Sequence, residues 1–102
     1  MITLVVDATE LGPGQTRVVE HRGTSVLLCN VDGDYYALEN RCSHAAARLS
    51  VARLDGCLLE CPVHGARFDV RDGSVARRPA RRAIRTFPVV VSGGKVEIQL
   101  GP

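Results

Sequence analysis

The sequence predicts a small all-β protein, on three observations. Short runs rich in Val, Leu and Ile recur along the chain, and each has the length of a strand. Helical propensity is confined to residues 45–52, a segment too short for more than a turn or two. Pairs that favour the positive φ angles of tight turns punctuate the chain: Asp32-Gly33, Asp55-Gly56, Asp72-Gly73 and Gly93-Gly94.

The expected strands are short and follow one another along the whole chain. Gly12-Pro13-Gly14 breaks the chain after the first of them. The third contains a continuous apolar run, Val26-Leu27-Leu28-Cys29, in which Cys29 is expected to act as a small buried hydrophobe. In chain order, the expected strands are 3–6, 17–20, 26–31, 35–39, 57–60, 84–91 and 95–100.

Length and composition limit the classes of protein that this chain can form. At 102 residues it has room for a single domain, 1–102. Thirteen basic and eleven acidic side chains give a net charge of +2, which makes no case for nucleic acid or a membrane surface as partner. The first residues lack the pattern of a secretory signal, and no stretch approaches the roughly 18 apolar residues of a membrane span. We therefore expect a cytoplasmic protein without disulfides.

Two mixed cysteine–histidine pairs are the most informative motif. Cys42-Ser43-His44 follows the expected strand 35–39, and Cys61-Pro62-Val63-His64 follows the expected strand 57–60. Each pair therefore begins a loop that leaves the end of a strand, and two such loops can face each other across a metal centre. Two thiolates and two imidazoles suit either zinc or an iron–sulfur centre.

The spacing C-x-H-x16-C-x2-H, followed by Gly65, resembles the Rieske family from about residue 34 to residue 100. The resemblance implies stacked antiparallel sheets with two cluster-binding loops at one end, within about 40–68. It also implies one [2Fe–2S] cluster, with Cys42 and Cys61 on one iron and His44 and His64 on the other. Pro79-Ala80 resembles a third segment that passes near the cluster in this family.

Departures from the high-potential members of the family indicate a low reduction potential. Respiratory members carry an extra cysteine in each cluster loop, where this chain has Ala47 and Val63. They also carry a serine and a tyrosine that donate hydrogen bonds to sulfur, where this chain has Ala66 and Phe68. Hydrogen bonds to sulfur stabilise the reduced cluster, and this chain offers fewer of them. We therefore expect a reduction potential of roughly −150 mV.

The resemblance implies an electron carrier rather than an enzyme. Low-potential, single-domain members are Rieske-type ferredoxins of multicomponent aromatic ring-hydroxylating dioxygenases. They pass single electrons from a flavin-dependent NAD(P)H reductase to a terminal oxygenase. By this resemblance we expect a monomer that docks transiently through its His44/His64 tip and has no catalytic residues of its own.

Several alternatives remain open on the sequence. A structural zinc site is possible, although zinc fingers usually pair Cys with Cys and His with His. A small Rieske subunit of a nitrite reductase and an accessory electron-transfer partner of another oxygenase or reductase also fit. A complete oxygenase does not fit, because His21 is the only histidine outside the two pairs and cannot build the two-histidine iron site of those enzymes.

Five arginines lie close together near the C-terminal third of the chain: Arg77, Arg78, Arg81, Arg82 and Arg85. They form either a solvated loop or, if the resemblance places Pro79-Ala80 near the cluster, a positive rim that steers an acidic partner. Cys57, four residues before Cys61, has no histidine beside it and is expected to be structural.

Overall fold

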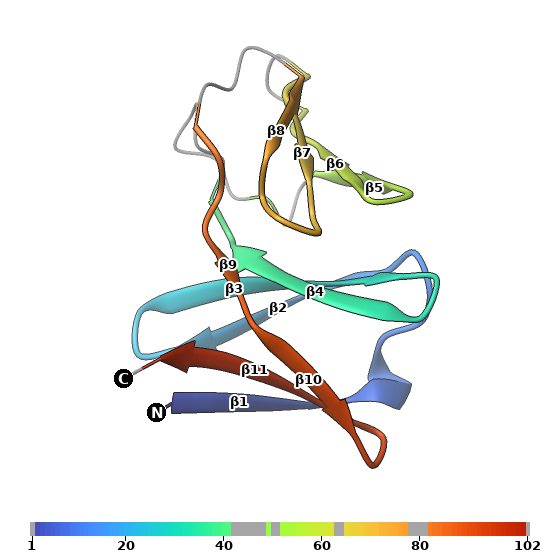
Figure 1. Ribbon diagram of the computed structural model, residues 1–102, viewed down its shortest axis with the longest axis vertical. Coiled ribbons are helices and arrows are strands. Elements are labelled where there is room, and N and C mark those ends of the chain that lie inside the picture. The colour runs from blue at the N-terminus through green and yellow to red at the C-terminus, as the bar shows by residue number, and fades with distance from the viewer. Residues whose placement is uncertain (1, 42–48, 50–51, 63–64, 78–81, 102) are drawn as a thin grey trace.

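The computed structural model describes residues 2–41, 49, 52–62, 65–77 and 82–101 and confirms the all-β class. Three antiparallel sheets lie in succession along the longest axis of the molecule (Figure 1). Sheet A has the order β1 (Ile2–Asp7), β11 (Lys95–Gly101) and β10 (Val89–Ser92). Sheet B has the order β2 (Thr16–His21), β3 (Thr24–Val31), β4 (Asp34–Glu39) and β9 (Thr86–Phe87). Sheet C has the order β5 (Arg53–Asp55), β6 (Leu58–Glu60), β7 (Arg67–Asp69) and β8 (Val75–Arg77).

Sheet B is the central layer, and its strand β3 is buried on both faces. Successive side chains of a strand point to opposite faces. Val26 and Leu28 therefore contribute to one core, against sheet A, while Leu27 and Cys29 contribute to a second core, against sheet C. This arrangement explains why β3 reads as a continuous apolar run instead of an alternating pattern. The role expected for Cys29, a small buried hydrophobe, is confirmed.

The two cores have different partners across sheet B. The core toward sheet A collects Val6, Val96 and Ile98 from β1 and β11, together with Phe87. The core toward sheet C collects Leu59, Phe68 and other residues of the outer strands. Every one of these six side chains is at most 6% exposed. Burial of such side chains contributes roughly 1.5–3 kcal/mol each, so both cores stabilise the fold.

Sheet C belongs to a single long excursion of the chain out of sheet B. The chain leaves sheet B at the end of β4 and returns to it at β9, which pairs with β4 through Ala37↔Phe87 and Leu38↔Thr86. The Glu39 N–H also donates to the Arg85 carbonyl at 2.8 Å, which joins the two stems. We call residues 40–85 the outer layer and the remaining residues the base.

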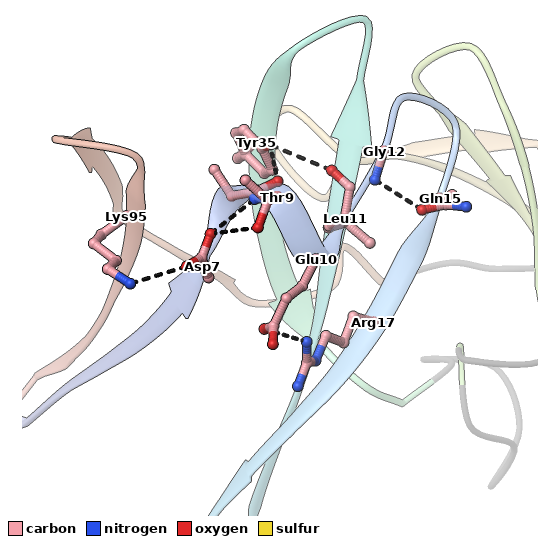
Figure 2. A network of polar contacts seen from close by, with 10 residues as sticks. Asp7, Thr9, Glu10, Leu11, Gly12, Gln15, Arg17, Tyr35 and Lys95 are labelled. Carbon is pink, nitrogen blue, oxygen red and sulfur yellow. Dashed lines mark hydrogen bonds and ion pairs between the residues drawn. The ribbon is translucent and has the colours of Figure 1, made fainter.

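A short 3-10 helix, η1 (Ala8–Glu10), links β1 to the loop before β2 (Figure 2). The Asp7 carboxylate caps it by accepting hydrogen bonds from the Thr9 N–H and hydroxyl, at 3.0 and 2.7 Å. The same carboxylate contacts Lys95 at 3.0 Å, and Glu10 contacts Arg17 at 2.6 Å. These contacts tie the N-terminal strand to sheets A and B.

The structure differs from the sequence expectation in the strand expected at 84–91. That segment forms two strands in different sheets, because β9 pairs with β4 in sheet B and β10 pairs with β11 in sheet A. The change of sheet occurs at Pro88, which has no N–H to continue a ladder. Its carbonyl still accepts a hydrogen bond from the Gln99 N–H at 2.9 Å.

Four further elements were not expected: η1, β5, β7 and β8. The three strands have only three residues each, too few for an alternating pattern to stand out. Of the helical turn expected at 45–52, the described part shows a single i→i+3 hydrogen bond, from the Ala52 N–H to the Leu49 carbonyl at 2.8 Å. Among the described residues, no helix is long and apolar enough to cross a membrane.

Candidate metal centre

The second ligand motif begins where the hairpin of β6 and β7 ends. Glu60 pairs with Arg67 in the last register of these strands, and Cys61 and Ala66 continue the hairpin by one further hydrogen bond. The Cys61 N–H donates to the Ala66 carbonyl at 2.8 Å, and the Gly65 N–H donates to the Cys61 carbonyl at 3.1 Å. Cys61 is thus anchored to rigid backbone at the start of a closed loop, as a metal ligand requires.

Gly65 closes this loop in a conformation that other residues adopt reluctantly. Its φ angle is +72°, in the left-handed region that glycine enters at no steric cost. A Cβ atom at this position would lie 3.6 Å from the Glu60 Oε1 atom, so Gly65 lies beside the Glu60 side chain. The glycine that follows the histidine in the motif therefore has a conformational role in turning the chain back into β7.

An ion pair holds the two strands together directly below the loop. The Arg67 guanidinium lies 3.2 Å from the Glu60 carboxylate, and both side chains are about one-third exposed. Partial burial strengthens such a pair relative to one at the surface. The sequence analysis did not predict this ion pair. The opposite charges at positions 60 and 67, just outside the two ends of the loop, could have indicated it.

The side chains around Cys61 form a dry, apolar setting. Cys61 is completely buried in the core that sheet C shares with sheet B, together with Leu59, Ala66 and Phe68. Neither Ala66 nor Phe68 offers a hydroxyl to a nearby sulfur. Cysteine thiolates bind zinc and iron–sulfur centres, so the residue type of Cys61 and its place at the start of the loop fit a metal ligand.

The stem of the first ligand motif is fixed by Asn40, a buried polar residue. Its N–H donates to the Ser25 carbonyl at 2.9 Å, and its Nδ2 donates to the Ser25 hydroxyl at 3.1 Å. Arg41 follows, and its N–H donates to the Glu39 carbonyl at 2.8 Å. At the other end of this motif, Leu49 is completely buried in the same core as Cys61. Both flanks of the first loop are therefore anchored.

The return segment to the base is anchored at Gly73. The Ile84 N–H donates to the Gly73 carbonyl at 2.8 Å, and a Cβ atom on Gly73 would lie 2.0 Å from the Ile84 carbonyl oxygen. This close approach fastens the segment that follows Pro79-Ala80 to the turn between β7 and β8. The sequence associates three segments with the cluster: the two ligand motifs and Pro79-Ala80. The described residues that flank each of them belong to the outer layer.

Of the four expected ligands, Cys61 lies within the described residues, and Cys42, His44 and His64 lie outside them. Within the part of the chain that the structure describes, no group of three or more His, Cys, Asp and Glu side chains is placed to hold a metal ion. The complete four-ligand set and the third segment at Pro79-Ala80 remain predictions.

The other two described cysteines differ from Cys61 in their surroundings. Cys29 is completely buried in the middle of β3, and desolvation raises the pKa of its thiol to about 12. Because the thiolate is the form that binds metals, such a cysteine is a poor ligand. Cys57 is half-buried at the turn between β5 and β6, and its carbonyl accepts a hydrogen bond from the Val70 N–H at 2.8 Å.

Comparison with known proteins gives a consistent result. The family model of the Rieske [2Fe-2S] domain matches residues 1–88. The ferredoxin component of a naphthalene 1,2-dioxygenase system from Pseudomonas aeruginosa is 40% identical over 91 residues, which cover 89% of this chain and 88% of the relative. The ferredoxin component of biphenyl 2,3-dioxygenase from Rhodococcus jostii (strain RHA1) is 35% identical over 99 residues, covering 97% and 92%.

Solved structures agree with these relatives. A chain in a complex of reduced oxygenase and oxidized ferredoxin of carbazole 1,9a-dioxygenase superposes with a TM-score of 0.91 and 36% identity, covering 95% of this chain and 92% of that chain. The ferredoxin of carbazole 1,9a-dioxygenase from Nocardioides aromaticivorans IC177 gives a TM-score of 0.87 and 32% identity, covering 92% of both chains.

Proposed function

The chain belongs to the Rieske [2Fe-2S] domain family, and from this premise we propose that Cys42, His44, Cys61 and His64 bind its cluster. It carries one Rieske-type cluster and is an electron-transfer component, as its relatives are, with no catalytic site of its own. The observation that carries the ligand assignment is the anchored, buried position of Cys61 at the end of the β6–β7 hairpin.

The bound cluster supplies one-electron redox chemistry, and the residues of this chain hold it and limit access to it. Cys61 contributes a thiolate from a backbone position fixed by hydrogen bonds to Ala66 and Gly65. Leu59, Ala66 and Phe68 exclude water on the core side of that thiolate. The absence of a hydroxyl at positions 66 and 68 supports the expected low potential of roughly −150 mV.

We propose that the protein passes single electrons from a flavin-dependent NAD(P)H reductase to the terminal oxygenase of an aromatic ring-hydroxylating dioxygenase. The relatives that support this proposal are ferredoxin components of naphthalene and biphenyl dioxygenase systems. A solved complex of such a ferredoxin with its oxygenase supports transient docking to an oxygenase partner. Residues 1–102 would act as one domain, a monomer in the cytoplasm.

Ligand variants test the assignment of the cluster site. We expect Cys61→Ala to abolish the visible absorption of the protein and the rhombic electron paramagnetic resonance signal of the dithionite-reduced cluster. Cys57→Ala and Cys29→Ala are the matched controls, and both should keep the signal, since neither thiol is a ligand in this assignment. The assignment of Cys61 is wrong if Cys61→Ala retains the wild-type signal. A colourless wild-type protein that contains zinc would contradict the electron-transfer function itself.

A further inference from the structure

Charge is divided unevenly between the two parts of the fold. The outer layer, residues 40–85, contains ten arginines and four acidic residues, a net charge of +6. The base contains three basic and seven acidic residues, a net charge of −4. The modest overall charge of +2 therefore conceals an uneven division along the chain, in which the segment that contains the predicted cluster loops is positive.

Ion pairs within the outer layer already occupy most of its carboxylates. Asp55 lies 3.8 Å from Arg53, Glu60 lies 3.2 Å from Arg67, and Asp69 lies 2.7 Å from Arg71. The pair of Asp69 and Arg71 is bidentate, with a second contact of 3.0 Å from Nε. The excess positive charge must therefore come from the other arginines of this layer, which include the exposed Arg41 and Arg85.

Arg41 and Arg85 meet on the two stems that join the outer layer to the base. Both line one hollow of about 320 Å³, together with Thr24, Ser25 and Asn40. Glu39, a half-buried residue, is the only acidic side chain among the described residues that line it. The hollow therefore combines two guanidinium groups with hydroxyl and amide groups, and its charge is positive.

The Arg85 side chain has a defined place in this hollow. Its guanidinium carbon lies 4.8 Å from the centre of the Phe87 ring, a cation–π contact. Stacking on an aromatic ring holds the planar group in one orientation and leaves its edge N–H groups free to bind a carboxylate in a bidentate manner. Arg41 directly precedes Cys42, the first expected ligand, so a partner that binds here lies beside the first cluster loop.

We propose that this stem hollow, with Arg41 and Arg85 as its anchors, is the docking site for an acidic surface of a protein redox partner. The inference rests on the proposed electron-transfer function and adds the chemistry of the partner. Charge separation orients the approach, because an acidic partner is attracted to the outer layer and repelled by the base. Clefts lined by one sign of charge raise association rates by roughly 10- to 1000-fold.

The test compares two double variants of equal net charge. Arg41→Glu/Arg85→Glu and Arg17→Glu/Lys95→Glu each change the net charge from +2 to −2, the first at the stem hollow and the second in the base. The probe is a reduced, acidic plant-type [2Fe–2S] ferredoxin, whose lower potential makes transfer of its one electron to the oxidised Rieske cluster favourable. Stopped-flow absorbance gives the second-order rate constant as a function of ionic strength.

At low ionic strength we expect the rate constant of Arg41→Glu/Arg85→Glu to fall at least about tenfold, and that of Arg17→Glu/Lys95→Glu no more than about threefold. Near 1 M salt the three proteins should converge, because the Debye length is then only about 3 Å. Equal rate losses in both variants would show steering by net charge alone and would overturn the docking site. A rate without dependence on salt would overturn it as well.

A binding measurement keeps this inference separate from the proposed function. Titration of the oxidised probe into isotopically labelled protein should shift the backbone NMR signals of Arg41, Arg85 and the neighbouring Thr24, and Arg41→Glu/Arg85→Glu should remove these shifts. Shifts centred on the base would contradict the docking site whether or not the cluster is present. A protein without a reducible cluster that still shows the expected shifts would contradict the electron-transfer function and support the docking site.

Discussion

The base and the outer layer differ in the length of their strands. Strands β1, β2, β3, β4 and β11 of the base have six to eight residues, whereas every strand of sheet C has three. A ladder of three residues contributes few hydrogen bonds, so sheet C depends on the core it shares with sheet B. The base also carries the long-range pairing of β1 with β11, which brings the two ends of the chain side by side (Figure 1).

This difference separates stability from function within one small fold. The base forms a packed pair of sheets with its own core, around Val6, Val26 and Val96. The outer layer contains the ligand motifs and most of the positive charge, and it packs on sheet B through the core that includes Leu27, Leu59 and Phe68. We therefore expect substitutions in the outer layer to affect the cluster as well as unfolding, and substitutions in the base to affect unfolding alone.

The largest expected effect is that of Gly73→Ala. A Cβ atom at this position would lie 2.0 Å from the Ile84 carbonyl oxygen, so the two backbones must separate and their hydrogen bond must break. We expect the free energy of unfolding to fall by at least about 3 kcal/mol, the range of severe steric and backbone defects. Loss of visible absorption and of far-UV circular dichroism on heating gives the two melting temperatures, for the cluster and for the fold.

Gly94→Ala is the matched control for this prediction. Gly94 has a φ angle of +77°, almost equal to the +76° of Gly73, and its added Cβ would meet nothing within 4 Å. The conformational cost alone is about 1 kcal/mol, which lowers the melting temperature by about 4–8 °C in a domain of this size. If both alanine variants melt at the same temperature, the close approach of Gly73 to Ile84 does not matter for stability.

A smaller, pH-dependent effect is expected at Asp7 in the base. Hydrogen bonds from the Thr9 backbone and side chain, and the contact with Lys95, lower the pKa of this carboxyl from 3.8 to about 2. A depressed pKa stabilises the folded state above the unfolded value, and this contribution is lost as the pH falls through the folded value. Asp7→Asn should therefore melt below the wild type at pH 7, and the difference should shrink between about pH 4 and pH 2.

Asp34→Asn provides the control for Asp7→Asn, because it also removes one negative charge from the exposed surface of the base. Melting followed by far-UV circular dichroism isolates the fold from any loss of the cluster in acid. A constant difference between wild type and Asp7→Asn from pH 7 to pH 2 would show that the carboxylate charge does not contribute. The Asp7 network then would act only through its geometry (Figure 2).

The sequence predicted the base better than the outer layer, for a physical reason. Strands of the base are long enough for their composition to stand out, and their turns carry signals such as Asp32-Gly33, whose φ angles are +51° and +95°. The strands β7 and β8 have three residues each, and their pairing depends on contacts with distant segments. The sequence predicted one strand across Pro88, and only the tertiary structure shows that the chain changes sheets there.

At the candidate site, the sequence predicted that Cys61 directly follows a strand, as the structure shows, while its role as a ligand remains a prediction. The hollow between Arg41 and Arg85 was not predicted, since these residues are far apart in the sequence and meet only through the pairing of β4 with β9. The arginines that the sequence analysis noted at 77–85 account for only part of the positive charge of the outer layer. The charge of the whole segment was recognised only when β4 and β9 proved to pair and so set residues 40–85 apart as one excursion from sheet B.

The smallest expected effect is a difference in alkylation rate between Cys29 and Cys57, the two described cysteines that are not expected ligands. Cys29 lies in the middle of β3, completely buried in the core toward sheet C, and its thiol pKa is raised to about 12. Cys57 is half-buried at a turn of the outer layer. Because alkylation requires an accessible thiolate, iodoacetamide should modify Cys57 well before Cys29 in the native protein, as mass spectrometry of the peptides can show.

The rate at which Cys29 reacts reports how sheet B separates from the outer layer. Its position in the core that sheets B and C share requires separation of these two sheets, whereas Cys57 requires only local opening of the turn between β5 and β6. A Cys57→Ser variant removes the fast phase and leaves the slow one to be measured alone. If Cys29 reacts as fast as Cys57, the core between sheets B and C opens as readily as that turn, and the outer layer is not packed on the base as firmly as the burial of Cys29 implies.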